Sequence, residues 1–244
     1  MTDSSILDGM DNVINEAFGL EKERIKYESK KRCQMFSKGK EPEFDGQALV
    51  QKILAKIESN WHQGKSRSTE NWRWGPKRGE LKTKSEEVIL ERWIVRTMGN
   101  DWMNQVPVAS GLTASRSAGG RRAIDLVHRC GDRWYEFIEL KVNDGAGAPL
   151  YAAMEILQYG VLYIFSRKHA ATLGYKETDM LGAPGIHLKV LAPANYYEGY
   201  HLSWLEDGIN SGLANFLDEG DRGFKMNFKF EFLSRSPVTW KARA

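Results

Sequence analysis

Residues 122–142 read RAIDLVHRCGDRWYEFIELKV, and this stretch decides the fold. Two strand-like runs, residues 122–128 and 133–142, flank a Cys130-Gly131-Asp132 turn in which the glycine supplies a permissive backbone. Both alternating faces of the second run are largely apolar, which is typical of a central strand that is covered on two sides. We therefore predict a β-hairpin in the interior of a sheet.

Helices and further strands are expected on both sides of this hairpin. Thr83 and Glu86 have the spacing of a capping box, and the apolar residues that follow them recur with helical periodicity. The other predicted elements are strands at 105–109, 186–192 and 224–232, a buried helix at 150–165 and an amphipathic helix at 203–217. The order helix, three strands, helix, strand predicts an α/β domain over residues 83–244, with a mixed central sheet flanked by helices.

The first third of the chain has a different character. Apolar residues at three- and four-residue steps predict helices over residues 6–18 and 45–58. Residues 62–84 lose this periodicity and place Lys and Arg residues around Trp72 and Trp74. We assign residues 1–82 to an N-terminal helical extension with a basic linker. That linker either grips a phosphate backbone while the indoles stack on bases, or is a solvated segment whose tryptophans fold onto the domain.

Composition sets broad limits on the class of protein. The 244 residues carry a formal net charge of +3, from 35 basic and 32 acidic residues, which neither requires nor excludes a nucleic-acid partner. Cys33 and Cys130 are far apart and in no metal-ligand spacing, so two free thiols in a reducing compartment are expected. The N-terminus lacks the basic head of a secretory signal, and no apolar run approaches the roughly 20 residues of a membrane span. We expect a cytoplasmic protein with no membrane partner.

Charged residues interrupt the apolar pattern of the hairpin. Glu139 and Lys141 stand at the end of the second strand, and a tight turn brings Asp125 close to Glu139. Burying such charges is costly unless they pair or hold a metal, and two converging carboxylates favour a hard cation, Mg²⁺ or Mn²⁺. The carbonyl of Leu140 is a natural further ligand, and the Lys141 ammonium can orient water or stabilise charge on a phosphate. The alternative is an ordinary salt bridge between Asp125 and Lys141.

These residues also form a recognisable motif. Ala123-Ile124-Asp125, followed after thirteen residues by Glu139-Leu140-Lys141, resembles the PD-(D/E)xK motif of restriction-endonuclease-like nucleases, although Ile124 replaces the proline. Two other E-x-K strings, at 28–30 and 80–82, lie in charged sequence outside any predicted strand, so context and not the string carries the match. The resemblance spans roughly residues 83–192 and implies an αβββαβ core. It further implies a metal-dependent nuclease in which Asp125 and Glu139 bind the metal and Lys141 assists hydrolysis.

The resemblance extends to neighbouring residues and to partners. It implies an acidic ligand from the preceding helix, for which Glu87 is favoured and Glu91 is held in reserve, and a glutamine–aromatic pair, Gln158-Tyr159, on the following helix. The arginines near the loop before Asp125 either contact the nucleic acid or decorate a surface loop; they are Arg116, Arg121 and Arg122. DNA is favoured over RNA, and a homodimer would suit paired cuts in a duplex. The competing hypothesis is an inactive nucleic-acid-binding or scaffold protein with the same fold.

Overall fold

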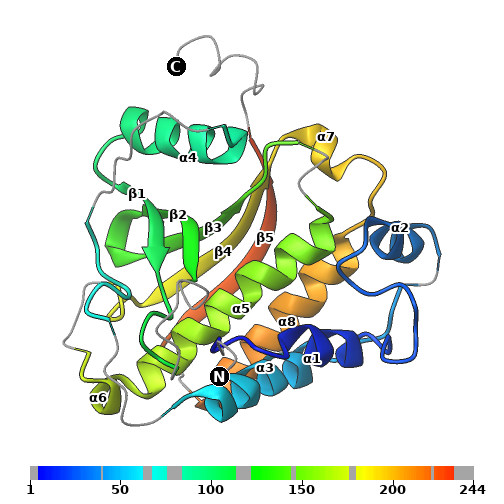
Figure 1. Ribbon diagram of the computed structural model, residues 1–244, viewed down its shortest axis with the longest axis horizontal. Helices are drawn as coiled ribbons and strands as arrows, with labels where there is room; N and C mark the ends of the chain where they lie inside the picture. Colours follow the sequence, from blue (N-terminus) through cyan, green and yellow to red (C-terminus); the bar gives the residue numbers. More distant parts are fainter. Residues whose placement is uncertain are drawn as a thin grey trace.

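The predicted hairpin lies in the middle of a five-stranded sheet in the computed structural model (Figure 1). The structure describes residues 5–39, 41–62, 68–75, 84–113, 122–143, 147–175, 180–220 and 223–233. The strands follow one another across the sheet as β1 (Trp102–Pro107), β2 (Ala123–Arg129), β3 (Tyr135–Leu140), β4 (Gly185–Ala192) and β5 (Lys225–Phe232). The first three are antiparallel and the last three parallel, so the predicted α/β class with a mixed sheet is confirmed.

Strand β3 is covered on both faces, as its sequence predicts. Tyr135 and Phe137 are buried in a large cluster shared with the helices on one side of the sheet. Ile138 and Leu140 are buried in a smaller cluster on the other side. A short 3-10 turn, Gly131–Arg133, closes the hairpin. This two-sided burial gives the charged end of β3 an apolar setting.

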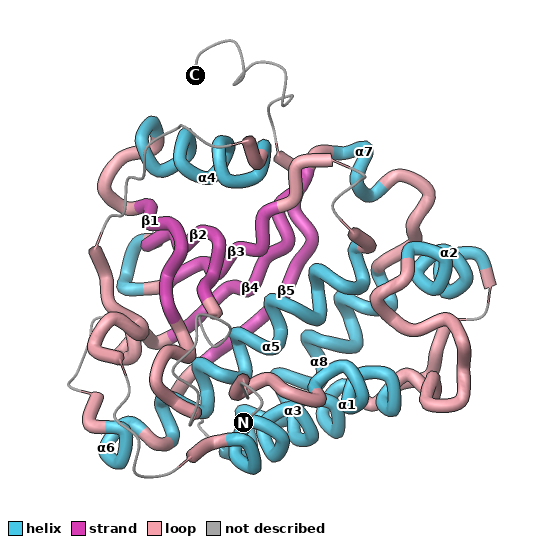
Figure 2. Tube along the Cα trace, in the orientation of Figure 1, coloured by secondary structure: helices cyan, strands magenta, loops and turns pink. Residues whose placement is uncertain are grey.

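Helices form layers on the two faces of the sheet (Figures 1 and 2). Helix α4 (Glu86–Thr97) is the one helix of the described part of the chain that packs on one face, where it buries Leu90, Ile94 and Val95. Its N-cap is Ser85, whose side chain accepts a hydrogen bond from Val88 N; the predicted cap Thr83 lies outside the described residues. The helix begins later than predicted because a serine directly before two glutamates satisfies both the cap and the helix dipole. None of the described helices is long and apolar enough to cross a bilayer.

The opposite face carries α5 (Pro149–Lys168) and α8 (Ser203–Gly220), with the short helices α6 (Ala170–Leu173) and α7 (Ala194–Tyr197) nearby. Gly160 lets α5 lie close on β4, because a Cβ there would be 2.6 Å from Leu188 Cδ1. Proline at the first position of α5 suits the start of a helix. The position of α5 matters because this helix delivers further charged and polar groups to the end of β3.

Three N-terminal helices form an outer layer on α5 and α8: α1 (Met10–Ala17), α2 (Lys30–Lys38) and α3 (Gly46–Asn60). Contact between α3 and α8 is so close that a Cβ on Gly46 would lie 2.1 Å from the carbonyl oxygen of Gly208. Ile53 of α3 and Leu213 of α8 belong to the same hydrophobic cluster. Residues from both sides of the predicted boundary at 83 therefore share one core.

The tryptophans of the basic linker fold onto the domain, which is the second of the two alternatives. Trp72 is fully buried, its Nε1 donates to Ser166 Oγ at 2.9 Å, and its ring stacks on Phe137. Trp74 packs against Tyr135 and beneath the guanidinium of Arg129. Trp72 is thus part of the core and has no free face for a base.

Candidate active site

Strands β2 and β3 carry two predicted site residues to the same place. Their ladder ends at the Leu126–Ile138 pair, so the next step places Asp125 opposite Glu139. Asp125 Oδ2 accepts a hydrogen bond from Leu140 N at 3.0 Å. This bond fixes the carboxylate beside the Glu139-Leu140-Lys141 segment.

Lys141 lies in the same group of charges. Its Nζ is 2.5 Å from Glu139 Oε1, so its direct ion pair is with Glu139 rather than with Asp125. Burial opposes the charge of Lys141, but Glu139, Glu87 and Glu155 outweigh burial and raise the pKa of this ammonium. Lys141 therefore stays a cation in a largely buried position.

The two hairpin carboxyls are held in a setting that disfavours their charge. Burial is the largest cause that raises the pKa of Asp125 to about 7, and the charges of Glu87 and Glu91 add to this rise. The hydrogen bond from Leu140 N and the charge of Lys141 act in the opposite direction. Glu139 is 3 % exposed, and its burial raises the pKa of its carboxyl well above the ordinary value. The charges of Asp125 and Glu155 raise this pKa further, and Lys141 lowers it only in part. The single positive charge of Lys141 does not balance the negative charges of the carboxylates around it.

Helix α4 contributes both predicted acids, in different settings. Glu91 is buried, and its two oxygens accept from Asn104 Nδ2 at 2.6 Å and Gln105 Nε2 at 2.8 Å. Glu87 is half-buried, and burial is the main cause of its raised pKa. The charge of Glu155 adds to this rise, and Lys141 opposes it. Because Glu91 already has two amide donors, Glu87 is the α4 acid with more freedom to bind a cation.

Gln105 is a site residue that the sequence did not indicate. It stands in β1 opposite Asp125, and its backbone is left-handed, with φ of 51°. Its Nε2 lies 2.8 Å from Glu91 Oε2 and 3.5 Å from Asp125 Oδ1, so it bridges α4 and β2. A left-handed glutamine costs about 1 kcal/mol or more and persists only where its surroundings enforce it. No sequence signal marks this conformation.

Glu155 on α5 is a second site residue missed by sequence reasoning. Its Oε2 lies 4.0 Å from Lys141 Nζ, and its charge helps to raise the pKa of Glu139 and of Tyr159. Glu155 precedes Tyr159 by one helical turn and therefore shares its face. That spacing relative to the Gln158-Tyr159 pair could have identified it.

The remaining predicted residues are distributed unevenly. Tyr159 is buried, and its pKa is raised by burial and then by Glu155 and Glu139, so it borders the site. Gln158 is also buried, but its side chain donates back to Met154 O of its own helix at 3.1 Å. Arg122 is half-buried next to the start of β2, and its Nε has no hydrogen-bond partner among the described residues. Arg116 and Arg121 lie outside the described residues.

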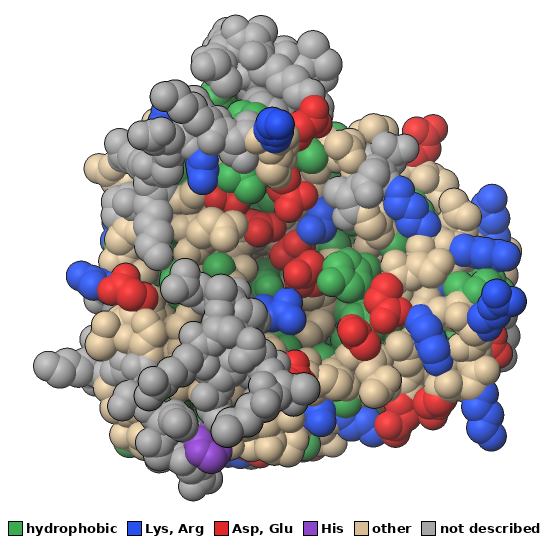
Figure 3. Space-filling view, in the orientation of Figure 1, with side chains coloured by type: hydrophobic (Ala, Val, Ile, Leu, Met, Phe, Trp, Pro, Cys, Tyr) green, Lys and Arg blue, Asp and Glu red, His purple; other side chains and the backbone are tan. Residues whose placement is uncertain are grey.

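Acidic side chains gather over the strand ends between α4 and α5 in the space-filling view (Figure 3). No family model, curated protein or solved structure matches this chain. Functional inference therefore depends on the geometry of the site. Asp125, Glu139 and Glu87 offer hard carboxylate oxygens, the donor type that Mg²⁺ and Mn²⁺ prefer. Burial first, and neighbouring carboxylates after it, raise the pKa values of these three groups, and a bound divalent cation would offset both effects, so this donor set fits such an ion.

Proposed function

We propose that this protein is a divalent-metal-dependent nuclease with a restriction-endonuclease-like fold. The observation that carries the proposal is the meeting of Asp125, Glu139 and Lys141 at the end of two central strands, where carboxylates outnumber cations. An ion pair of purely structural value would need one acid for one ammonium. This site places Glu87 and Glu155 within the field of Lys141 as well.

The order of elements supports the fold part of the proposal. Along the chain, α4, β1, β2, β3, α5 and β4 follow one another as in an αβββαβ core. The strands that carry the acids lie in the middle of the sheet, and both layers of helices contribute acids to their end. Strand β5 and the outer helices are additions to that order.

In this proposal Asp125, Glu139, Glu87 and the Leu140 carbonyl hold Mg²⁺ or Mn²⁺. The bound ion would supply a polarised phosphate and a more acidic water. Lys141 contacts Oε1 of Glu139, so in this proposal Oε2 is the oxygen that would face the ion. Lys141 then stands beside the reacting phosphate, where its ammonium orients the attacking water or stabilises developing negative charge.

Arg122 is the described residue best placed to contact the substrate backbone. It lines a hollow of about 480 Å³ together with Gln105 and Ala123, directly beside Asp125. A guanidinium beside the acids is the type of side chain that contacts phosphate oxygens, often through two parallel hydrogen bonds. The proposed partner is nucleic acid, with DNA favoured over RNA, and a homodimer would permit paired cuts in a duplex.

The test is a cleavage screen over single- and double-stranded DNA and RNA, with Mg²⁺, Mn²⁺ or EDTA. Wild-type protein is expected to cleave at least one DNA substrate, in the presence of the divalent ion only. Glu139→Gln keeps the shape of the side chain and should abolish cleavage, whereas Asp207→Asn, on the exposed face of α8, should not change it. Cleavage in EDTA, or full activity of Glu139→Gln, would remove this site from the reaction. Binding of DNA without cleavage under every condition would establish the inactive alternative.

A further inference from the structure

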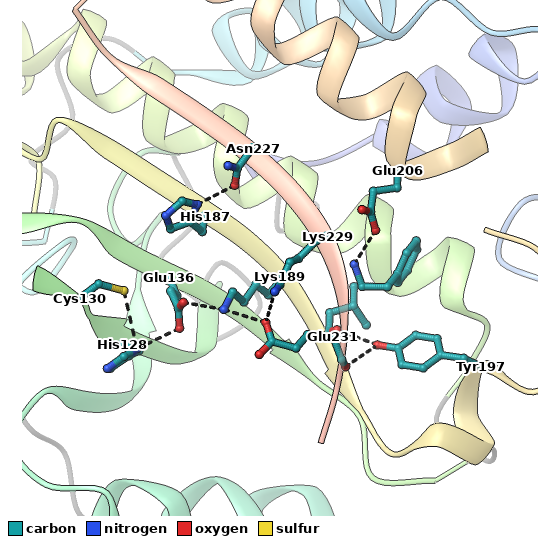
Figure 4. A network of polar contacts seen from close by, with 12 residues as sticks. His128, Cys130, Glu136, His187, Lys189, Tyr197, Glu206, Asn227, Lys229 and Glu231 are labelled. Atoms are coloured by element: carbon teal, nitrogen blue, oxygen red, sulfur yellow. Dashed lines mark hydrogen bonds and ion pairs between the residues drawn. The ribbon is translucent and has the colours of Figure 1, made fainter. Parts of the chain in front are cut away.

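Three potential metal ligands converge near the turn of the same hairpin, outside the proposed nuclease site (Figure 4). His128 and Glu136 are cross-strand partners of β2 and β3, and Cys130 follows His128 by two residues. His128 Nδ1 lies 2.9 Å from Glu136 Oε2 and 3.7 Å from Cys130 Sγ. The three ligand atoms all lie within 4.8 Å of one another, a spread that one ion can span.

Surrounding contacts orient two of the three groups. The His128 ring stacks on Trp102 with centroids 4.3 Å apart, which sets the ring plane. Lys189 Nζ holds Glu136 Oε1 at 2.5 Å and is itself held by Glu231 at 2.8 Å, so Glu136 Oε2 is turned toward the histidine and the cysteine (Figure 4). Metal-binding side chains are commonly fixed by such outer contacts.

The main chain holds the cysteine in place. Cys130 N donates to Trp134 O at 2.8 Å, which closes the turn and keeps the thiol beside His128. All three side chains are partly exposed, so an ion can reach them from solvent. The cluster therefore combines accessible ligands with a rigid support.

We propose that His128, Cys130 and Glu136 form a zinc-binding site. One imidazole, one thiolate and one carboxylate suit Zn²⁺, whereas Mg²⁺ prefers oxygen donors alone. On binding, the thiol releases its proton to solvent, and the histidine carries its proton on Nε2 so that Nδ1 is free to bind. The charges of Zn²⁺, one thiolate and one carboxylate cancel, and a water completes four ligands.

Such an ion would fasten the turn end of the hairpin whose other end presents Asp125 and Glu139. It would tie residues of β2, the turn and β3 together. The inference is independent of the proposed nuclease activity, since neither Asp125 nor Glu139 belongs to this cluster.

Cobalt titration of the EDTA-treated full chain tests the site directly, because Co²⁺ bound to a thiolate absorbs in the near ultraviolet and carboxylate-bound Co²⁺ does not. Wild-type protein should show this band, and Zn²⁺ should displace it. Cys130→Ser should abolish the band, whereas Cys33→Ser, at the buried cysteine of α2, should keep it. His128→Ala should weaken Co²⁺ binding at least tenfold, whereas His187→Ala, on neighbouring β4, should not.

Stability provides a second measurement that does not depend on the variants' spectra. A hundredfold excess of Zn²⁺ over its dissociation constant should raise the Tm of wild type by roughly 5 to 10 °C. Glu139→Gln should show the same zinc-dependent rise, which separates this site from the nuclease site. A folded wild type without the thiolate band, or a band that survives in Cys130→Ser, would overturn the proposal. If Cys130→Ser does not fold, loss of the band in folded Glu136→Gln supports the site and its persistence overturns it.

Discussion

Replacing Asp125 by Asn should make the metal-free protein more stable at alkaline pH while abolishing metal-dependent cleavage. Asp125 carries a pKa of about 7 in the fold, against an ordinary value of 3.8. A group whose pKa is raised in the folded state contributes most to the free energy of unfolding below its unfolded pKa, where it is protonated in both states. That contribution is lost as the pH rises through the folded pKa, because the unfolded state can ionise more easily than the folded state.

The size of the effect follows from these two values. At pH 8 a pKa raised from 3.8 to about 7 costs about 4 kcal/mol, and at pH 5 the cost is about 2 kcal/mol, because the cost grows with the distance of the pH above the unfolded pKa until the folded pKa is reached. The wild type should therefore lose roughly 2 to 3 kcal/mol between pH 5 and pH 8 from this group. Asn has no charge to bury and retains an oxygen that can accept from Leu140 N, so the variant should lose much less.

Urea denaturation in EDTA at pH 5, 6, 7 and 8 measures this difference. The free energy of unfolding of Asp125→Asn relative to wild type should increase steadily over that range. Asp101→Asn is the matched control, because Asp101 forms an exposed pair with Arg129 and should show no such trend. A pH-independent difference, or a variant that becomes relatively weaker at pH 8, would refute the claim that Asp125 is held in an unfavourable setting.

Three further predictions concern the site and its support. Lys141→Met should lower the cleavage rate by about 10² to 10³ with little change in substrate binding, measured by single-turnover kinetics beside binding assays. Glu155→Gln should move the acidic limb of the pH–rate profile to lower pH, because the charge of Glu155 helps to raise the pKa of Glu139; a move to higher pH would contradict this. Gly46→Ala should lower the free energy of unfolding by about 1 to 3 kcal/mol, measured by urea denaturation, because its Cβ would meet the Gly208 carbonyl; an unchanged value would show that α3 and α8 can separate freely.

The fold class could be predicted because the apolar residues on both faces of the hairpin's second strand indicate that this strand is buried on two sides. Strand alternation at Tyr135, Phe137, Ile138 and Leu140 separates two apolar faces, and the structure places them in two clusters as expected. Element ends were less predictable: β1 begins at Trp102 rather than at 105, because Trp102 and the residue after it pair with β2. The cap of α4 moved to Ser85 for a similarly local reason.

Only those site residues could be predicted that are close together in the sequence or that lie on the same hairpin. Asp125, Glu139 and Lys141 belong to such a unit, and the structure brings them together. Gln105 was missed because its left-handed backbone is imposed by tertiary packing, and Glu155 because periodicity marks α5 only as a buried helix. The two cysteines have no ligand spacing between themselves, and the neighbours of Cys130 become visible only when the β2–β3 register is known.

The shared core of the N-terminal helices has a practical consequence for genetics. Helix α3 is packed against α8 through bare backbone at Gly46, and α1 packs on α3 in turn. Substitutions in these helices can abolish activity by destabilising the packing that holds α5 in position. Loss-of-function screens will therefore score many residues in the first sixty as essential, and only a parallel measure of folded protein will tell them from the chemical residues.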